Sequence, residues 1–342
     1  MPTRQHRRTT HRFWIFLLIL SIAFAASWAL VFRPSASGPR PPRVANRPSA
    51  PVFGLNPWKV SPVRLHEPMM GLAAVSTPSA LWVLGGLVQD QSTTLIQKVT
   101  WTKSGLPQSL QVVSPGLPVP VHDAAAVALN GHIVLLGGGT YTSSAAVYSL
   151  PVPAMAPASS LGSLPEPLSD LAAQVDGGRI LVVGGHNAGV PSNVIWSYAP
   201  GHASRVWADL PAGVRYAAAA ASAHTLYVVG GLTATGVTNQ AIAFNLKTRK
   251  MTMLPPYPVA LQYAEAIVID HTLVVAGGQT AAGWTRAVYW YQSASRTWRQ
   301  APDLPSPAGY GALVPTPSGG AAWVGGQGPS GALDTIWTIS MR

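Results

Sequence analysis

The 342-residue sequence contains no cysteine, and only 10% of its side chains are charged. Without cysteine there is no disulfide, no thiolate metal site, no cysteine nucleophile and no lipidated cysteine of the bacterial lipoprotein type. The chain is instead rich in glycine (33), proline (32) and tryptophan (12). This composition is typical of many short strands joined by tight turns, so it predicts an all-β fold.

Acidic residues are scarce, and they are spread unevenly along the chain. Residues 1–50 hold eight arginines and no acid, which leaves 14 lysines and arginines against 11 acids in residues 51–342. The net charge of +11 therefore describes mainly the N-terminal part. The rest of the chain is close to neutral, so we expect no nucleic-acid partner.

Residues 13–32 form one uncharged, apolar run. A helix of this length, at about 1.5 Å per residue, crosses the roughly 30 Å hydrocarbon core of a bilayer once. The arginines of the basic tail, residues 1–12, predict that this tail is cytoplasmic and that the remaining chain lies on the extracytoplasmic side of the cell membrane. Residues 33–55 have the composition of a proline-rich linker. The alternative is a cleaved signal peptide ending near Ala23-Phe24-Ala25, in which case the protein is secreted.

A glycine pair preceded by an apolar strand recurs through the remaining chain. The second glycines are 52, 47, 46, 47 and 48 residues apart, and they are Gly86, Gly138, Gly185, Gly231, Gly278 and Gly326. In the second repeat, Asn130-Gly131 separates two apolar runs, which is a strong hairpin signal. A third strand with an aromatic residue follows each pair, and several repeats add a fourth with Trp and Leu-Pro. Four strands in a period of about 47 residues predict one propeller blade per repeat.

This pattern resembles the kelch repeat over residues 56–342. The resemblance implies an all-β, six-bladed kelch-type β-propeller, here preceded by one N-terminal transmembrane helix. The final repeat ends after its third strand, so the fourth strand, with its Trp, is missing there. The segment around Trp58 carries a Trp in the place expected for that fourth strand. We therefore expect the segment around Trp58 to complete the last blade and close the ring.

The repeat aligns the loops that surround the expected channel mouth, where propellers bind their ligands. Three columns of the alignment are rich in polar or aromatic side chains, and we take twelve of them as candidate ligand-binding residues: His122, Asp123, Ser169, Asp170, His186, Arg215, Tyr216, Gln262, Tyr263, Gln279, Tyr310 and Gln327. Such a mouth could stack a sugar ring and bind its hydroxyl groups, or hold a peptide carboxylate on Arg215. The structural alternative is that the tyrosines pack between blades and that the aspartates cap turns.

No cofactor motif is present, and no metal site is expected. His122 and His186 lie in neighbouring repeats with Asp123 and Asp170 beside them, but no local ligand spacing supports a metal. The glycines at 137–139 lack the residues of a phosphate-binding loop.

We therefore interpret the chain as an extracytoplasmic, membrane-anchored module that binds a glycan, a peptide or an envelope protein. Kelch enzymes provide the alternative, a carbohydrate-active enzyme similar to the sugar epimerases and mutarotases of the sialic-acid type. Galactose oxidase chemistry is excluded because it requires a cysteine. Glu265 and Arg215 are the candidate catalytic residues for the alternative, because Glu265 is an acid on a predicted inner strand.

Overall fold

The structure is a computed structural model, and it describes residues 53–152 and 157–342. The predicted transmembrane segment 13–32, the basic tail 1–12 and most of the 33–55 linker lie outside the described residues. Within the described residues, no helix has the length and apolar character needed to span a bilayer.

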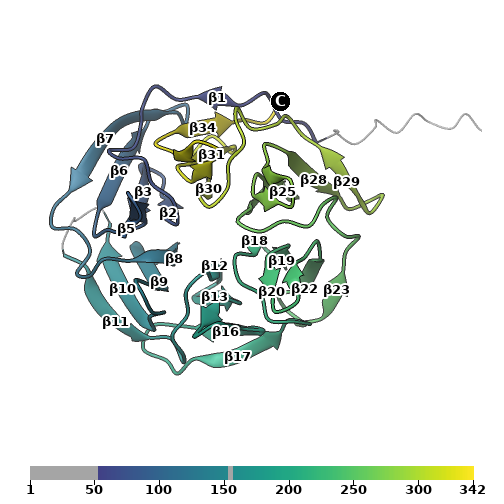
Figure 1. Cartoon of the computed structure of the whole chain (residues 1–342), viewed down its shortest axis with the longest axis horizontal. Coiled ribbons are helices and arrows are strands. Elements are labelled where there is room, and N and C mark those ends of the chain that lie inside the picture. Colours follow the sequence, from purple (N-terminus) through teal and green to yellow (C-terminus); the bar gives the residue numbers. More distant parts are fainter. Residues whose placement is uncertain (1–52, 153–156) are drawn as a thin grey trace, which may run out of the picture. The chain divides into compact units, whose positions relative to one another are not determined.

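Six four-stranded antiparallel sheets are arranged as blades around a central channel (Figure 1). From the inner to the outer strand, the first three blades are β2 (Ala73–Ser76), β3 (Ala80–Leu84), β6 (Ile96–Trp101), β7 (Pro107–Val113); β8 (His122–Leu129), β9 (His132–Gly139), β10 (Ala146–Pro151), β11 (Ser159–Ser163); and β12 (Ala172–Asp176), β13 (Arg179–Val183), β16 (Val194–Tyr198), β17 (Arg205–Asp209). The other three are β18 (Ala218–Ala221), β19 (Thr225–Val229), β22 (Ala241–Asn245), β23 (Met251–Met253); β24 (Glu265–Ile269), β25 (Thr272–Ala276), β28 (Val288–Gln292), β29 (Thr297–Gln300); and β30 (Ala312–Pro315), β31 (Ala321–Val324), β34 (Ile336–Ile339), β1 (Lys59–Val60). The expected six-bladed propeller is confirmed.

The last blade joins the two ends of the described chain. Strand β1 pairs with β34, so the segment around Trp58 supplies the outer strand of blade 6, as predicted. The Trp58 indole donates to the carbonyl of Pro302 at 3.0 Å, and the Asn56 amide donates to Ser340 and Met341 at 3.0 and 2.8 Å. The ring is thus closed by side chains as well as by the strand ladder.

The hairpins and glycine pairs have the backbone geometry that their residues favour. Asn130 and Gly131 both have positive φ, as a tight hairpin turn requires. Gly85 has a φ of 60°, and a Cβ built on it would lie 2.4 Å from the carbonyl oxygen of Val121 in the next blade. Only glycine permits this approach between neighbouring blades.

The core lies between blades rather than in one central cluster. Each interface buries aliphatic side chains of two blades, as where Leu81 and Val83 pack with Val314 and Val324. The inner strands use small residues instead, such as the four alanines of β18. The narrow channel wall and the wide outer wedges are therefore filled by side chains of matching size.

Five short hairpins project around the channel on the face where the inner strands begin. They are β4–β5 (Leu87–Val88, Gln91–Ser92), β14–β15 (His186–Asn187, Val190–Pro191), β20–β21 (Leu232–Thr233, Gly236–Val237), β26–β27 (Gln279–Thr280, Gly283–Trp284) and β32–β33 (Gln327–Gly328, Gly331–Ala332). This face is the predicted channel mouth.

Candidate functional site

One residue from each blade forms a closed backbone ring at the mouth. In this ring, each backbone N–H donates to the carbonyl of the preceding member at 2.9 to 3.2 Å, and the members are Gly71, Asp123, Asp170, Tyr216, Tyr263 and Tyr310. The ring ties the six inner strands together where they begin. It also sets the height at which the five side chains enter the channel.

All six ring residues have left-handed backbone conformations, with φ between 53° and 59°. Glycine adopts this conformation freely, whereas a tyrosine there costs roughly 1 to 2 kcal/mol. The chain therefore accepts backbone strain at Tyr216, Tyr263 and Tyr310, although blade 1 shows that glycine fits the same ring. Strain retained in this way is characteristic of functional sites.

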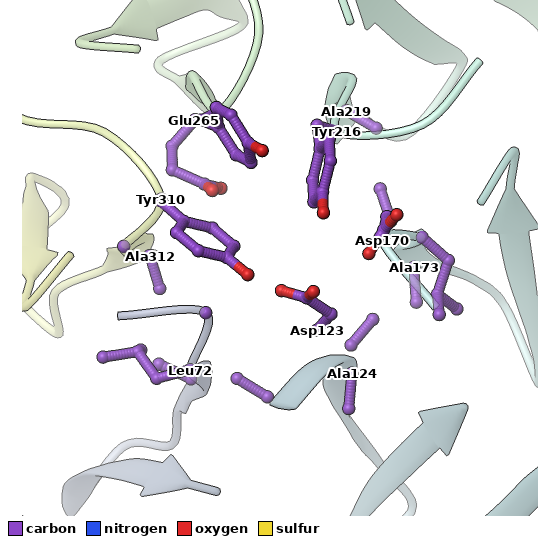
Figure 2. Close-up of a pocket in the computed structure, with 18 of the residues that line it drawn as sticks. Leu72, Asp123, Ala124, Asp170, Ala173, Tyr216, Ala219, Glu265, Tyr310 and Ala312 are labelled. Atoms are coloured by element: carbon purple, nitrogen blue, oxygen red, sulfur yellow. The ribbon is translucent and has the colours of Figure 1, made fainter. Parts of the chain in front are cut away.

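The ring side chains converge on the channel axis. In Figure 2 the carboxyl groups of Asp123 and Asp170 and the hydroxyls of Tyr216 and Tyr310 point toward one another. The Tyr263 ring packs against both other tyrosines, with centroids 4.1 Å from Tyr216 and 4.7 Å from Tyr310. These tyrosines contact one another across the channel instead of filling the wedges between blades.

Arg215 contacts both an aspartate and a tyrosine of the ring. Its Nε lies 3.0 Å from Oδ2 of Asp170, and its terminal NH2 donates to the Tyr216 hydroxyl at 3.0 Å. The guanidinium also sits 4.5 Å from the centre of the Tyr216 ring. Asp170, whose side chain is 4% exposed, is thus neutralised by a partly buried cation.

Burial changes the acid–base behaviour of Asp123. It raises the pKa of the Asp123 carboxyl well above the ordinary value, and the nearby charge of Asp170 raises this pKa further. Burial also raises the pKa of the neighbouring Tyr310 phenol. The mouth therefore holds a carboxyl that is harder to ionise than an ordinary aspartate beside phenol groups, so hydrogen-bond donors and acceptors are adjacent.

Two histidines lie at the edge of the carboxyl pair. Nε2 of His122 is 3.6 Å from Asp123, and Nδ1 of His186 is 3.9 Å from Asp170. Burial lowers the pKa of His122, against a smaller opposing effect of Asp170, so its imidazole is neutral at pH 7. The other ring nitrogen of His122 shares a hydrogen bond of 2.8 Å with Ser92.

The matching model among known families is the kelch motif, over residues 167–211 and 260–305. These residues coincide with two blades of the observed propeller, and the other four have the same strand order. The chain is a six-bladed β-propeller that contains kelch motifs. The solved structure of YjhT is similar to it, with a TM-score of 0.70 at 14% sequence identity, over 82% of this chain and 99% of that one. That likeness concerns the fold alone. No curated relative matches the sequence.

The other predicted rim residues of the kelch propeller face each other in pairs. Short backbone bridges join the residue before each ring position to the residue that follows the glycine pair of the same blade. These bridges are Ser169 to His186, Arg215 to Leu232 and Gln262 to Gln279. The amide of Gln262 also donates to Gln279 at 3.0 Å. Gln327 bridges Gly309 at the equivalent place in blade 6.

Three mouth residues were missed by the alignment. Ser92 contacts His122, Ser143 bonds Ser169 at 3.0 Å, and the Trp284 ring lies 5.9 Å from Tyr263. All three are in variable loops or hairpins after the glycine pairs, where the repeat gives no common register. An aromatic residue in such a loop, as at Trp284, is the one signal that could have identified them.

The channel contains a cavity of about 160 Å³, which is lined by the six ring residues and otherwise mainly by alanines of the inner strands. Glu265, the first residue of β24, faces this cavity (Figure 2). Burial raises the pKa of Glu265 to about 8, so this side chain is largely protonated at neutral pH. Gln174, on the same wall, is already bonded to the backbone of Ala219 and Ala221.

In the part of the chain that the structure describes, no group of three His, Asp or Glu side chains is arranged to hold a metal ion. The side chains at the mouth can donate and accept protons, form hydrogen bonds and stack on aromatic faces.

Proposed function

We propose that this protein is a membrane-anchored binding module whose extracytoplasmic kelch propeller captures a glycan at the channel mouth. The membrane anchor and the topology are inferred from residues 13–32 and from the basic tail that precedes them. The choice of a glycan as the ligand is inferred from the ring side chains. The observation that carries the proposal is that the carboxyl groups of Asp123 and Asp170 meet the three tyrosines of the ring at one site.

A saccharide matches this combination of groups. Its vicinal hydroxyls both donate and accept hydrogen bonds, and the carboxyl groups of Asp123 and Asp170 and the tyrosine hydroxyls offer both acceptors and donors. Its apolar ring faces pack on aromatic side chains, which Tyr263 and Trp284 supply on one side of the mouth. The fixed backbone ring holds these groups in place before a ligand arrives, which reduces the entropy cost of binding.

The state of Arg215 favours a saccharide over a peptide carboxylate. A carboxylate ligand would have to compete with Asp170 for the guanidinium of Arg215, whose Nε lies 3.0 Å from Asp170 and whose terminal NH2 donates to the Tyr216 hydroxyl. Binding an external carboxylate would leave Asp170 buried without its partner, which is costly.

A second candidate function, acid–base catalysis on a sugar, is favoured by one specific observation. Two neighbouring carboxyls, one of them with a raised pKa, are an arrangement that general acid–base chemistry uses. Asp123 is the candidate acid and Asp170 the candidate base. Arg215 contacts Asp170, and Glu265 lines the same cavity as the ring residues.

The test is a glycan array probed with the full-length protein in detergent. The variants are Asp123→Asn with Tyr263→Ala at the mouth, and Tyr289→Ala as control, since Tyr289 packs on Tyr257 away from the ring. We expect saturable binding to a defined saccharide class, lost in the double variant and kept in the control. Absence of wild-type binding, or equal loss in both variants, would contradict the proposal.

The same saccharide then separates binding from catalysis. Incubation with the wild-type protein, followed by NMR of its anomeric and ring protons, reports isomerisation or hydrolysis. Product formed by wild type and absent with Asp123→Asn supports the second candidate. An unchanged spectrum supports the binding module.

A further inference from the structure

A second cleft lies between blades 3 and 4, on the face opposite the channel mouth. Inner strand β12 begins at the mouth and ends at Asp176, and the turn that follows leads to Arg179, the first residue of β13. A strand of this length extends roughly 17 Å, so Arg179 lies well away from the ring. The cleft has a volume of about 490 Å³, and its lining includes Arg179, His202, Arg205, Trp207 and Arg249.

The charge of this cleft is positive and largely uncompensated. Arg179 is paired with Asp176, to which its Nε donates at 2.9 Å. Arg205 and Arg249 have exposed side chains, and no carboxylate lies within ion-pair distance of either one in residues 53–152 and 157–342. Two guanidinium groups from neighbouring blades therefore line one cleft without a partner.

Trp207 lies at the same place and joins the two blades. It is 2% exposed and packs at 5.8 Å against Phe244 of blade 4. Its Nε1–H is fully buried without a hydrogen-bond partner, as are those of Trp82 and Trp101. The tryptophan therefore positions the two blades that carry the arginines, and its N–H is not exposed to the cleft.

We propose that this cleft is a phosphate-binding site, in which Arg205 and Arg249 bind the anion. Guanidinium forks match phosphate oxygens, and two of them supply enough donors for a group with three or four acceptor oxygens. The ligand is a phosphate ester, either a lipid headgroup or a phosphate of a soluble molecule or polymer. This site does not depend on the proposed function of the mouth.

The experiment is calorimetric titration of the full-length protein in detergent with inorganic phosphate, glycerol phosphate and a short-chain phosphatidylglycerol. The test variant is Arg205→Gln with Arg249→Gln. The matched control is Arg296→Gln. Arg296 occupies the corresponding turn of blade 5, with the same left-handed backbone as Arg249, but it lies outside the cleft.

We expect the double arginine variant to weaken binding of inorganic phosphate by about tenfold or more. Arg296→Gln should leave binding unchanged. Tighter binding of phosphatidylglycerol than of glycerol phosphate identifies a lipid headgroup, and equal binding identifies a soluble phosphate. The proposal is overturned if none of the three probes binds, if the double variant binds like wild type, or if Arg296→Gln has the same effect as the double variant. Saccharide binding at the mouth should survive in every one of these variants.

Discussion

The Nε of Arg215 lies 3.0 Å from Oδ2 of Asp170, although these residues belong to adjacent blades, so the ion pair crosses a blade boundary at the channel mouth. Asp170 is the last ring residue before Tyr216, and its backbone carbonyl also accepts from the Tyr216 N–H. The electrostatics of the mouth and the closure of its backbone ring therefore depend on the same two blades.

Removing the charge of Asp170 should destabilise the fold. In Asp170→Asn the Arg215 guanidinium loses its counter-charge at a largely buried position, which we expect to lower the free energy of unfolding by about 2 to 3 kcal/mol. Asp303→Asn is the control, because the Asp303–Arg286 pair is longer, at 3.4 Å, and more exposed. It should cost less than about 1 kcal/mol. Urea unfolding followed by tryptophan fluorescence measures both, and equal effects would argue against a special role for the mouth pair.

The first ring position should not accept a side chain. A Cβ on Gly71 would lie 2.9 Å from the Tyr310 hydroxyl and 2.9 Å from Oδ1 of Asp123. Gly71→Ala should therefore displace both groups and abolish saccharide binding, and its cost should exceed the roughly 1 kcal/mol of an alanine with positive φ. Gly131→Ala isolates that backbone cost, since Gly131 has a φ of 77° and open space around it. Similar stability and binding in the two variants would contradict this explanation.

Much of the fold and part of the site follow from the sequence. The spacing of the glycine pairs locates the blades because each blade is one supersecondary unit with a fixed number of strands. The same alignment places four residues at equivalent positions: His122, Ser169, Arg215 and Gln262. In the structure, each of them pairs with the residue that follows the glycine pair of its own blade. The missing outer strand is also predictable, because a propeller with an unpaired edge must take a strand from elsewhere in the chain.

Side-chain direction was not predictable in the same way. The sequence does not show that Arg215 turns toward Asp170 of the preceding blade, since that contact crosses a boundary between repeats. Trp207 and Trp298 occupy similar motifs, but an irregular register at Ile195/Trp196 directs Trp207 toward blade 4. The near-neutral charge of residues 51–342 gave little reason to expect an anion site, because an average over the chain does not show that Arg205 and Arg249 meet.

Glu265 should make stability depend on pH in a defined direction. The folded-state pKa of about 8 is above the ordinary value of 4.5, so the unfolded chain releases this proton first as pH rises. The contribution of Glu265 to stability is therefore fully present below about pH 4.5 and declines up to about pH 8, with a slope of at most about 1.4 kcal/mol per pH unit. Glu265→Gln should remove this decline and match the wild type at low pH. A wild-type stability curve parallel to that of the variant would disprove the assigned protonation state.

Ring closure by the chain ends should be visible in local dynamics. Trp58→Ala removes an indole that bonds Pro302, and we expect faster amide exchange in β34 and β31 together with a loss of about 2 kcal/mol in stability. Trp298→Ala removes the comparable indole that bonds Pro255, between blades joined by continuous chain. It should leave exchange in β34 unchanged. Hydrogen exchange with mass spectrometry resolves these strands. Equal exchange of β34 in both variants would show that the blade closed by the two chain ends is not locally less stable than the others.

The central claim is that a saccharide binds at the ring of Asp123, Asp170 and the three tyrosines. Hydrogen exchange of the full-length protein, with and without the tightest saccharide found on the array, locates the bound ligand directly. We predict slower exchange in the segments that carry the ring side chains, residues 122–124, 169–171, 215–217, 262–264 and 309–311, with no change around Arg205 and Arg249. Protection confined to the outer strands or to the opposite face, with the ring segments unchanged, would contradict the claim.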